Sequence, residues 1–187
     1  MPETDPILQA LRDFADRVTR KASQITTGEP EDQLRAPFER FMEDLAQARA
    51  LRLVCTGETP LPGRLGTPDF AVHASDLLAG YVELKAPGKG ADPRRFKGRD
   101  KDQWKRFQAI PNLLYTDGNE WGLYRTGKRE RPIARLSGDV AADGKKAVTA
   151  EACSAASPAG PPVGASPLPP AQPAAESGTR TLIAVGT

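Results

Sequence analysis

The most informative segment of the chain begins with Pro68-Asp69 and, after thirteen further residues, ends with Glu83-Leu84-Lys85. Apolar and polar residues alternate over residues 67–73, and residues 77–86 are rich in apolar side chains, so each segment is predicted to form a strand. Residues 73–80 are predicted to form the turn between them. Because side chains two apart in a strand point to the same face, Glu83 and Lys85 project together. The predicted hairpin then brings Asp69 beside them.

Two carboxylates on one hairpin, assisted by the carbonyl of Leu84, form an oxygen site that suits a hard ion such as Mg²⁺. Such an ion polarises a phosphate and lowers the pKa of a bound water. The ammonium of Lys85 would orient that water, deprotonate it or stabilise the developing charge, and the sequence leaves these roles open. The alternative interpretation is that Asp69 ends a strand and that Glu83 and Lys85 lie on a solvated face. Because the bare spacing is common, its structural context has to decide between the two.

The segments around the hairpin have the periodicity of helices and short strands. Apolar residues recur at helical spacing over residues 6–25, 31–50 and 99–110, which predicts three amphipathic helices. The sequence therefore predicts an α/β fold with a mixed central sheet flanked by helices. Further strands are predicted at residues 51–56, 113–115 and 120–124, with an edge strand at 133–136.

Composition limits the classes of function. The two cysteines, Cys55 and Cys153, and the one histidine, His73, exclude a disulfide framework and a cysteine/histidine zinc site within one chain. There is no apolar run long enough to span a membrane, and the first residues are acidic, so we expect a cytoplasmic protein without a membrane partner. Residues 150–187, rich in alanine and proline, are expected to be a disordered tail after one domain at residues 1–149.

Positive charge is concentrated after the second strand of the hairpin. Residues 85–106 contain nine basic and three acidic side chains, although the whole chain has a net charge of only +2. Such a strip is suited to the phosphates of nucleic acid, and the alternative is a solvated loop and helix face. Spacing indicates that Trp104, Trp121 and Tyr124 pack in the core rather than stack on bases. The basic residues predicted to contact DNA are Arg94, Arg95, Lys97, Lys101 and Lys105.

The sequence resembles a known nuclease family over roughly residues 31–125. The resemblance rests on four segments, which are residues 66–70, 81–88, 103–107 and 111–118. They look like the PD-(D/E)xK nuclease domain at the N-terminus of single-polypeptide restriction-modification enzymes, in which this domain is fused to an adenine methyltransferase. The combination of segments is far more specific than the three catalytic positions alone, and the resemblance implies a restriction-endonuclease-like mixed central sheet flanked by helices.

This resemblance implies a role for each motif residue. Asp69 and Glu83 would be the metal ligands and Lys85 the catalytic lysine of a Mg²⁺-dependent DNA endonuclease. Glu31 matches the helical glutamate that such folds place near the metal, and Glu39 is a competing candidate. Gln103 matches a glutamine-x-x-x-tyrosine element, although Phe107 replaces the tyrosine and removes its hydroxyl.

Several alternatives stay open at this stage. The domain is either an endonuclease, a DNA-binding module of the same fold that does not cut, or an inactive fragment of a larger restriction-modification enzyme. A structural or interaction domain is a further possibility, which the salt dependence of DNA binding would test. The resemblance also implies a methyltransferase and target-recognition region or subunit as a partner. Cutting of both strands would favour a transient dimer.

Overall fold

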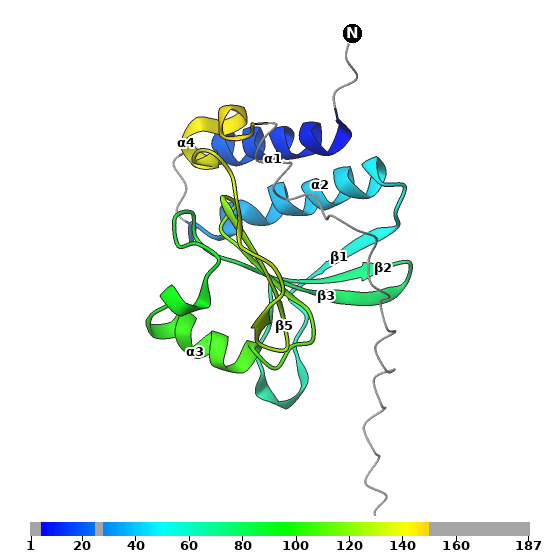
Figure 1. Ribbon diagram of the computed structural model, residues 1–187, viewed down its shortest axis with the longest axis vertical. Helices are drawn as coiled ribbons and strands as arrows, with labels where there is room; N and C mark the ends of the chain where they lie inside the picture. The colour runs from blue at the N-terminus through cyan, green and yellow to red at the C-terminus, as the bar shows by residue number, and fades with distance from the viewer. Residues whose placement is uncertain (1–4, 25–27, 150–187) are drawn as a thin grey trace, which may run out of the picture.

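The computed structural model describes residues 5–24 and 28–149. In this part of the chain, one curled mixed sheet lies between helices, with α1 and α2 on one side and α3 on the other (Figure 1). This arrangement confirms the predicted fold class. The expected disordered tail at 150–187 lies outside the described residues. The helices are α1 (Pro6–Ala22), α2 (Asp32–Ala48), α3 (Gly98–Phe107) and the short α4 (Val140–Asp143).

The sheet has the strand order β1-β2-β3-β4-β5-β6, and β7 pairs with β5 beside this series. Only β3 and β4 pair in parallel among these strands, so the connection between them has to cross over, and it contains α3. The crossover places α3 against the face of the sheet near the end of β3. The strands are β1 (Leu53–Gly57), β2 (Phe70–Ala74), β3 (Leu77–Leu84), β4 (Leu113–Thr116), β5 (Glu120–Arg125), β6 (Lys128–Arg129) and β7 (Ala134–Arg135).

The β2–β3 hairpin turns more tightly than the sequence predicts. Ser75 and Asp76 form its two-residue loop, and both have positive φ angles, 48° and 69°. Two central residues with positive φ are the mark of a type I′ turn, whose twist matches that of the flanking strands. The strands therefore extend into the predicted turn region. Their register aligns Phe70 with Val82, which places Asp69 at the level of Glu83.

The two faces of the sheet pack against separate cores. Against α1 and α2 lie Phe70, Val82 and Leu84, together with the aromatic residues of those helices. Facing α3 are Leu113, Tyr115 and Tyr124, which pack with Phe107 and Trp104. Trp121 belongs to the first core, so the prediction that the three large aromatic residues are packing residues is confirmed. Since side chains alternate along a strand, Glu83 and Lys85 lie on the α3 face.

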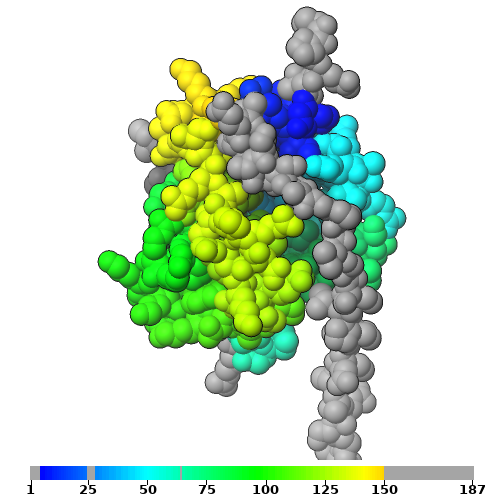
Figure 2. All heavy atoms as spheres, viewed as in Figure 1, coloured from blue at the N-terminus to red at the C-terminus, as the bar shows by residue number. Residues whose placement is uncertain are grey.

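Short elements near the end of the described chain complete the domain. The segment from β5 to α4, coloured yellow-green to yellow, covers one face of the molecule between α1 and α3 (Figure 2). Val140 of α4 is buried against the core under α1. The sequence predicts neither α4 nor β6, because elements of two to four residues leave no periodic pattern. In the described residues, no helix is both long and apolar enough to cross a membrane.

Candidate active site

The three hairpin residues come together at one end of the β2–β3 ribbon. Asp69 directly precedes β2, Glu83 is the second-to-last residue of β3, and Lys85 directly follows β3. Lys85 continues the strand pairing, because its backbone N–H donates to the carbonyl of Thr116 across 2.8 Å. The side chains of Glu83 and Lys85 are 7% and 3% exposed. The alternative interpretation, a solvated strand face, therefore does not hold for these two residues.

Lys85 is held by two elements of the fold. Its Nζ lies 3.0 Å from Oε1 of Glu83 and 2.6 Å from Oε1 of Gln103. A third carboxylate, Asp100, places Oδ1 at 3.1 Å from the same nitrogen. An ammonium has three donors, so these three partners account for all of them. The structure thus brings Gln103 into the site, as the sequence predicts.

Asp100 is a residue of the site that sequence reasoning missed. It lies in the first turn of α3, three residues before Gln103, and residues three apart share one face of a helix. That spacing is the signal that would have identified it. Asp100 also pairs with Lys89 across 2.8 Å, so α3 is joined to both the end of β3 and the loop that follows.

Asp69 is bound from both sides within the described residues. Its Oδ2 accepts a hydrogen bond of 2.7 Å from the backbone N–H of Leu84. Its Oδ1 lies 2.5 Å from Nη2 of Arg35, on α2. The first contact fixes Asp69 to the strand that carries Glu83, and the second joins it to the helix on the opposite side of the sheet.

Burial and mutual repulsion perturb the two carboxylates. The pKa of Glu83 is raised to about 7, mainly by burial and also by the nearby charge of Asp69, against the opposing effect of Lys85. Burial also raises the pKa of Asp69, while the Leu84 N–H and Arg35 lower it. For Lys85, burial lowers the pKa, but Glu83 and Asp100 raise it to a net value above the ordinary one. Ionisable groups with perturbed pKa values are concentrated at functional sites.

The donor set fits a hard divalent ion. Oε2 of Glu83 is buried and has no hydrogen-bond partner among the described residues, and such an oxygen is costly unless something binds it. Asp69 is close enough to act on the charge of Glu83. In residues 5–24 and 28–149 there is no group of three or more histidine, cysteine or acidic side chains in metal-binding arrangement. Two carboxylates still suffice for Mg²⁺, which commonly keeps several waters and takes one or two carboxylates.

A buried aspartate organises the loop after Lys85. Asp117, 2% exposed, follows β4, the strand that pairs with β3. Its Oδ2 accepts from the backbone N–H groups of Gly88 and Gly90, at 3.1 and 2.7 Å. Its Oδ1 accepts from those of Asn119 and Glu120, at 3.0 and 2.8 Å. One carboxylate therefore holds together the chain segments that leave β3 and β4.

The two predicted helical acids do not touch the hairpin. Glu31 is the N-terminal flanking residue of α2, and neither it nor Glu39 forms a hydrogen bond or ion pair with Asp69 or Glu83 in the described part of the chain. The charge of Glu39 acts instead on Cys55 of β1, where it adds to the effect of burial in raising the thiol pKa to about 11. Asp32 is the α2 acid whose charge acts on Asp69. A role for Glu31 stays a prediction.

The predicted DNA-contact residues are exposed, but they differ in their ion pairs. Arg94 pairs with Asp92, Arg95 with Glu120, and Lys105 with Asp102. Lys97 and Lys101 form no ion pair within the described residues. They lie just before and within the first turn of α3, near the helix face that holds Lys85. These two lysines are therefore the ones whose charge is least compensated internally.

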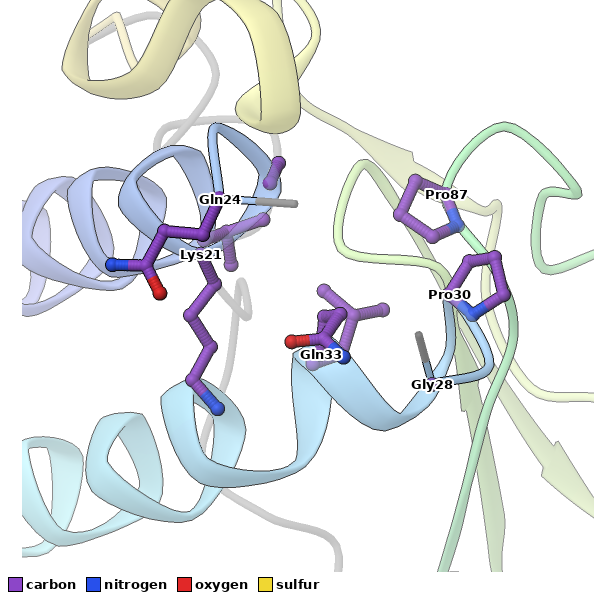
Figure 3. A pocket seen from close by; sticks show the side chains of 9 residues that line it. Lys21, Gln24, Gly28, Pro30, Gln33 and Pro87 are labelled. Carbon is purple, nitrogen blue, oxygen red and sulfur yellow. The ribbon is translucent and has the colours of Figure 1, made fainter. Parts of the chain in front are cut away.

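A cavity of about 260 Å³ lies beside the site but does not contain it. Its wall comes from the end of α1, the start of α2 and Pro87, two residues after Lys85. Figure 3 shows Pro30 and Pro87 on one side and the side chains of Lys21 and Gln24 on the other. None of the hairpin carboxylates lines it. The cavity therefore adds no ligand to the candidate active site.

Comparison with known proteins identifies no family for this chain. The sequence matches no protein-family model and no curated protein. Among solved structures, the chain is similar to one described as "cryoEM structure DrdV-DNA complex", with 21% sequence identity and a TM-score of 0.49. The similarity covers 75% of this chain and 13% of that chain, so this chain spans only a small part of its length. A likeness this distant carries no argument about function, which depends on the geometry described above.

Proposed function

We propose that this domain is a Mg²⁺-dependent endonuclease of the PD-(D/E)xK type, which hydrolyses phosphodiester bonds of DNA. The observation that carries the proposal is the buried, unpartnered Oε2 of Glu83 beside Asp69 and Lys85. A buried carboxylate oxygen that has no hydrogen-bond partner among the described residues is costly, and a divalent ion would satisfy it. The basic strip that begins at Lys85 supports DNA as the substrate.

Each side chain has a distinct task in this proposal. Asp69 and Glu83 would hold the ion, which when bound supplies polarisation of the phosphate and acidification of water. Lys85 adds a positive charge beside these two carboxylates. One N–H of its ammonium can exchange Gln103 or Asp100 for a phosphate oxygen or the attacking water. Gln103 keeps Lys85 and Glu83 aligned, because it donates to Glu83 through Nε2 across 2.7 Å while accepting from Lys85.

The direct test is cleavage of supercoiled plasmid by the purified protein. We expect nicking in Mg²⁺ and none in Ca²⁺ or chelator. Lys85→Ala should lower the rate by about 100-fold or more, because it removes charge stabilisation in the transition state. Lys128→Ala is the matched control, since it removes an exposed lysine of β6. Nicking that persists unchanged in Lys85→Ala would defeat the mechanism.

A second candidate is a DNA-binding module of the same fold that does not cut. The observation that favours it is the occupation of both Asp69 oxygens, by Arg35 and by the Leu84 N–H. Asp69→Ala separates the two candidates. Loss of Mg²⁺-dependent cleavage with retained DNA binding supports the enzyme, whereas a wild-type protein that binds DNA and never nicks it supports the module.

The proposal extends to the context in which the domain acts. A methyltransferase and target-recognition region or subunit would supply sequence specificity, because the strip of basic residues contacts phosphates and does not read bases. The isolated domain should therefore cut with little sequence preference. Double-strand cutting would need two copies of the site, which a transient dimer on DNA provides.

A further inference from the structure

Arg35 sits at the centre of a group of acids beside the candidate metal site. Its Nη2 lies 2.5 Å from Oδ1 of Asp69 and 3.5 Å from Oε1 of Glu58. Its Nε lies 3.3 Å from Oδ1 of Asp32. The acids come from three places in the fold, which are the start of α2, the end of β1 and the start of β2. The guanidinium of Arg35 thus forms ion pairs with three carboxylates.

The contact with Asp69 is unlike the other two. The Asp69 side chain is only 14% exposed, whereas those of Asp32 and Glu58 are 51% and 72% exposed. An ionised carboxylate that has little access to water needs a cation or strong donors nearby. Water can solvate Asp32 and Glu58 when no cation is close. Arg35 therefore matters most to Asp69.

Access to Asp69 for an ion depends on Arg35. The backbone N–H that binds Oδ2 belongs to β3 and cannot leave without breaking the strand. The guanidinium on Oδ1 is at the end of a long side chain that is 32% exposed, so a change of rotamer would move it without disturbing the backbone. A divalent cation bound to Oδ1 would also lie within a few ångströms of the guanidinium, and the two positive charges repel each other.

We propose that Arg35 is an internal counterion that holds the place of the divalent cation at Asp69 and leaves that oxygen when the ion binds. This inference rests on the proposed metal site. Asp32 and Glu58 are the carboxylates that keep the guanidinium after the exchange, since both already contact it. Arg35 is thus a positioning residue, which stabilises the site without metal and weakens the binding of metal to it.

The exchange predicts that removal of Arg35 tightens metal binding. Mn²⁺ serves as the probe, because electron paramagnetic resonance measures the concentration of free Mn²⁺ directly during a titration. We expect Arg35→Ala to bind Mn²⁺ about tenfold more tightly than the wild type. The matched control is Arg40→Ala, which removes the same charge from α2 where the arginine pairs with Glu43 and Asp44. Its affinity should equal that of the wild type.

A second variant and a second readout keep the test decisive if Arg35→Ala folds poorly. Arg35→Gln retains a polar side chain at the position and should also bind Mn²⁺ more tightly. Melting temperatures should show that the Arg35 variants are less stable than the wild type in chelator. That difference should narrow in saturating Mn²⁺, because the ion then supplies the charge that Arg35 supplied.

Two negative results have different meanings. Equal affinities in the wild type and the variants at Arg35 and Arg40, together with loss of binding in Asp69→Asn, would overturn the exchange and leave the metal site standing. Mn²⁺ binding that Asp69→Asn does not alter, or no binding in any variant, would overturn the proposed metal site and the exchange with it.

Discussion

The ammonium of Lys85 donates a 2.6 Å hydrogen bond to Oε1 of Gln103, on a helix that the chain reaches only after a thirteen-residue loop. The same amide donates to Glu83 through its nitrogen, across 2.7 Å. Gln103 therefore links Glu83 of β3 with Lys85, which follows β3. Its amide oxygen accepts from the ammonium, and its amide nitrogen donates to the carboxylate. A phenylalanine, Phe107, stands one turn later, and it is buried in the core under α3.

Replacement of Gln103 by alanine should lower the rate of plasmid nicking by about tenfold, or ~1.4 kcal/mol of transition-state stabilisation. The reason is that Lys85 and Glu83 lose their common partner and become less well positioned. The free energy of unfolding should fall by only about 1 kcal/mol, the usual contribution of a hydrogen bond. Gln108→Ala, at the exposed end of α3, is the control. A Gln103→Ala protein with full activity would show that the amide does not position either residue.

The stability of the metal-free protein should depend on pH through Glu83. Its pKa rises from the ordinary value of 4.5 to about 7 on folding, so between these pH values the native protein holds a proton that the unfolded chain has lost. The free energy of unfolding therefore falls as the pH rises from about 4.5 to 7, and this contribution is constant above that range. Glu83→Gln lacks the effect because its amide does not titrate.

Urea denaturation in chelator at pH 5, 6, 7 and 8 measures this dependence. The stability of Glu83→Gln relative to the wild type should increase between pH 5 and pH 8 by an amount on the order of 2 kcal/mol. Comparison of the two proteins at each pH cancels the titration of the groups that do not interact with Glu83. A relative stability that is the same at both ends of the range would contradict the raised pKa.

Asp117→Asn should destabilise the protein by about 2–4 kcal/mol, although the two side chains have the same shape. The carboxylate accepts from four backbone N–H groups, whereas an amide has one accepting oxygen and would direct its NH₂ at two donors. Chemical denaturation measures the loss. Asp102→Asn, at an exposed position of α3, should change stability by less than about 0.5 kcal/mol. Equal effects of the two substitutions would rule out the role assigned to Asp117.

Lys97 and Lys101 should contribute more to DNA binding than Arg94 or Lys105. The latter two are already paired with Asp92 and Asp102, so a phosphate has to compete with a carboxylate for them. Alanine at Lys97 or Lys101 should weaken binding to any duplex and reduce the slope of log K against log salt by about one. Fluorescence anisotropy over a range of NaCl concentrations measures both quantities. If the Lys105 variant has the larger effect on slope, the DNA path does not follow the start of α3.

The parts of the fold that the sequence predicts are those with a long repeating pattern. The first two helices and the one after the basic loop show helical periodicity over ten or more residues, and the structure contains all three. Their ends were less accurate, since α3 ends at Phe107 and not at 110. The β2–β3 pair was predictable because its strands show a repeating apolar pattern. Its tight turn was not, because the turn needs positive φ angles at Ser75 and Asp76, which these residue types can adopt but do not specify.

In the candidate site, too, only the residues that follow a local pattern could be predicted from the sequence. Neighbours along one element were predictable, because the two-residue period of a strand puts Glu83 and Lys85 on one face. Among the partners from other elements, Gln103 was indicated only by the family resemblance, and Asp100, Arg35 and Asp117 were all missed. Their contacts depend on how α3, α2 and β4 pack against the hairpin, which local pattern does not specify.

From the sequence alone, the α/β class, the hairpin and the pairing of an acid and a lysine on one strand follow, because each is a matter of local periodicity and short-range geometry. In contrast, the packing of separate elements buries Glu83 with one carboxylate oxygen unpartnered among the described residues, and it brings Arg35 into contact with Asp69. The physical reason is that burial and charge compensation arise where separate elements meet, and there the cost of removing a carboxylate from water is set by neighbours distant in the chain.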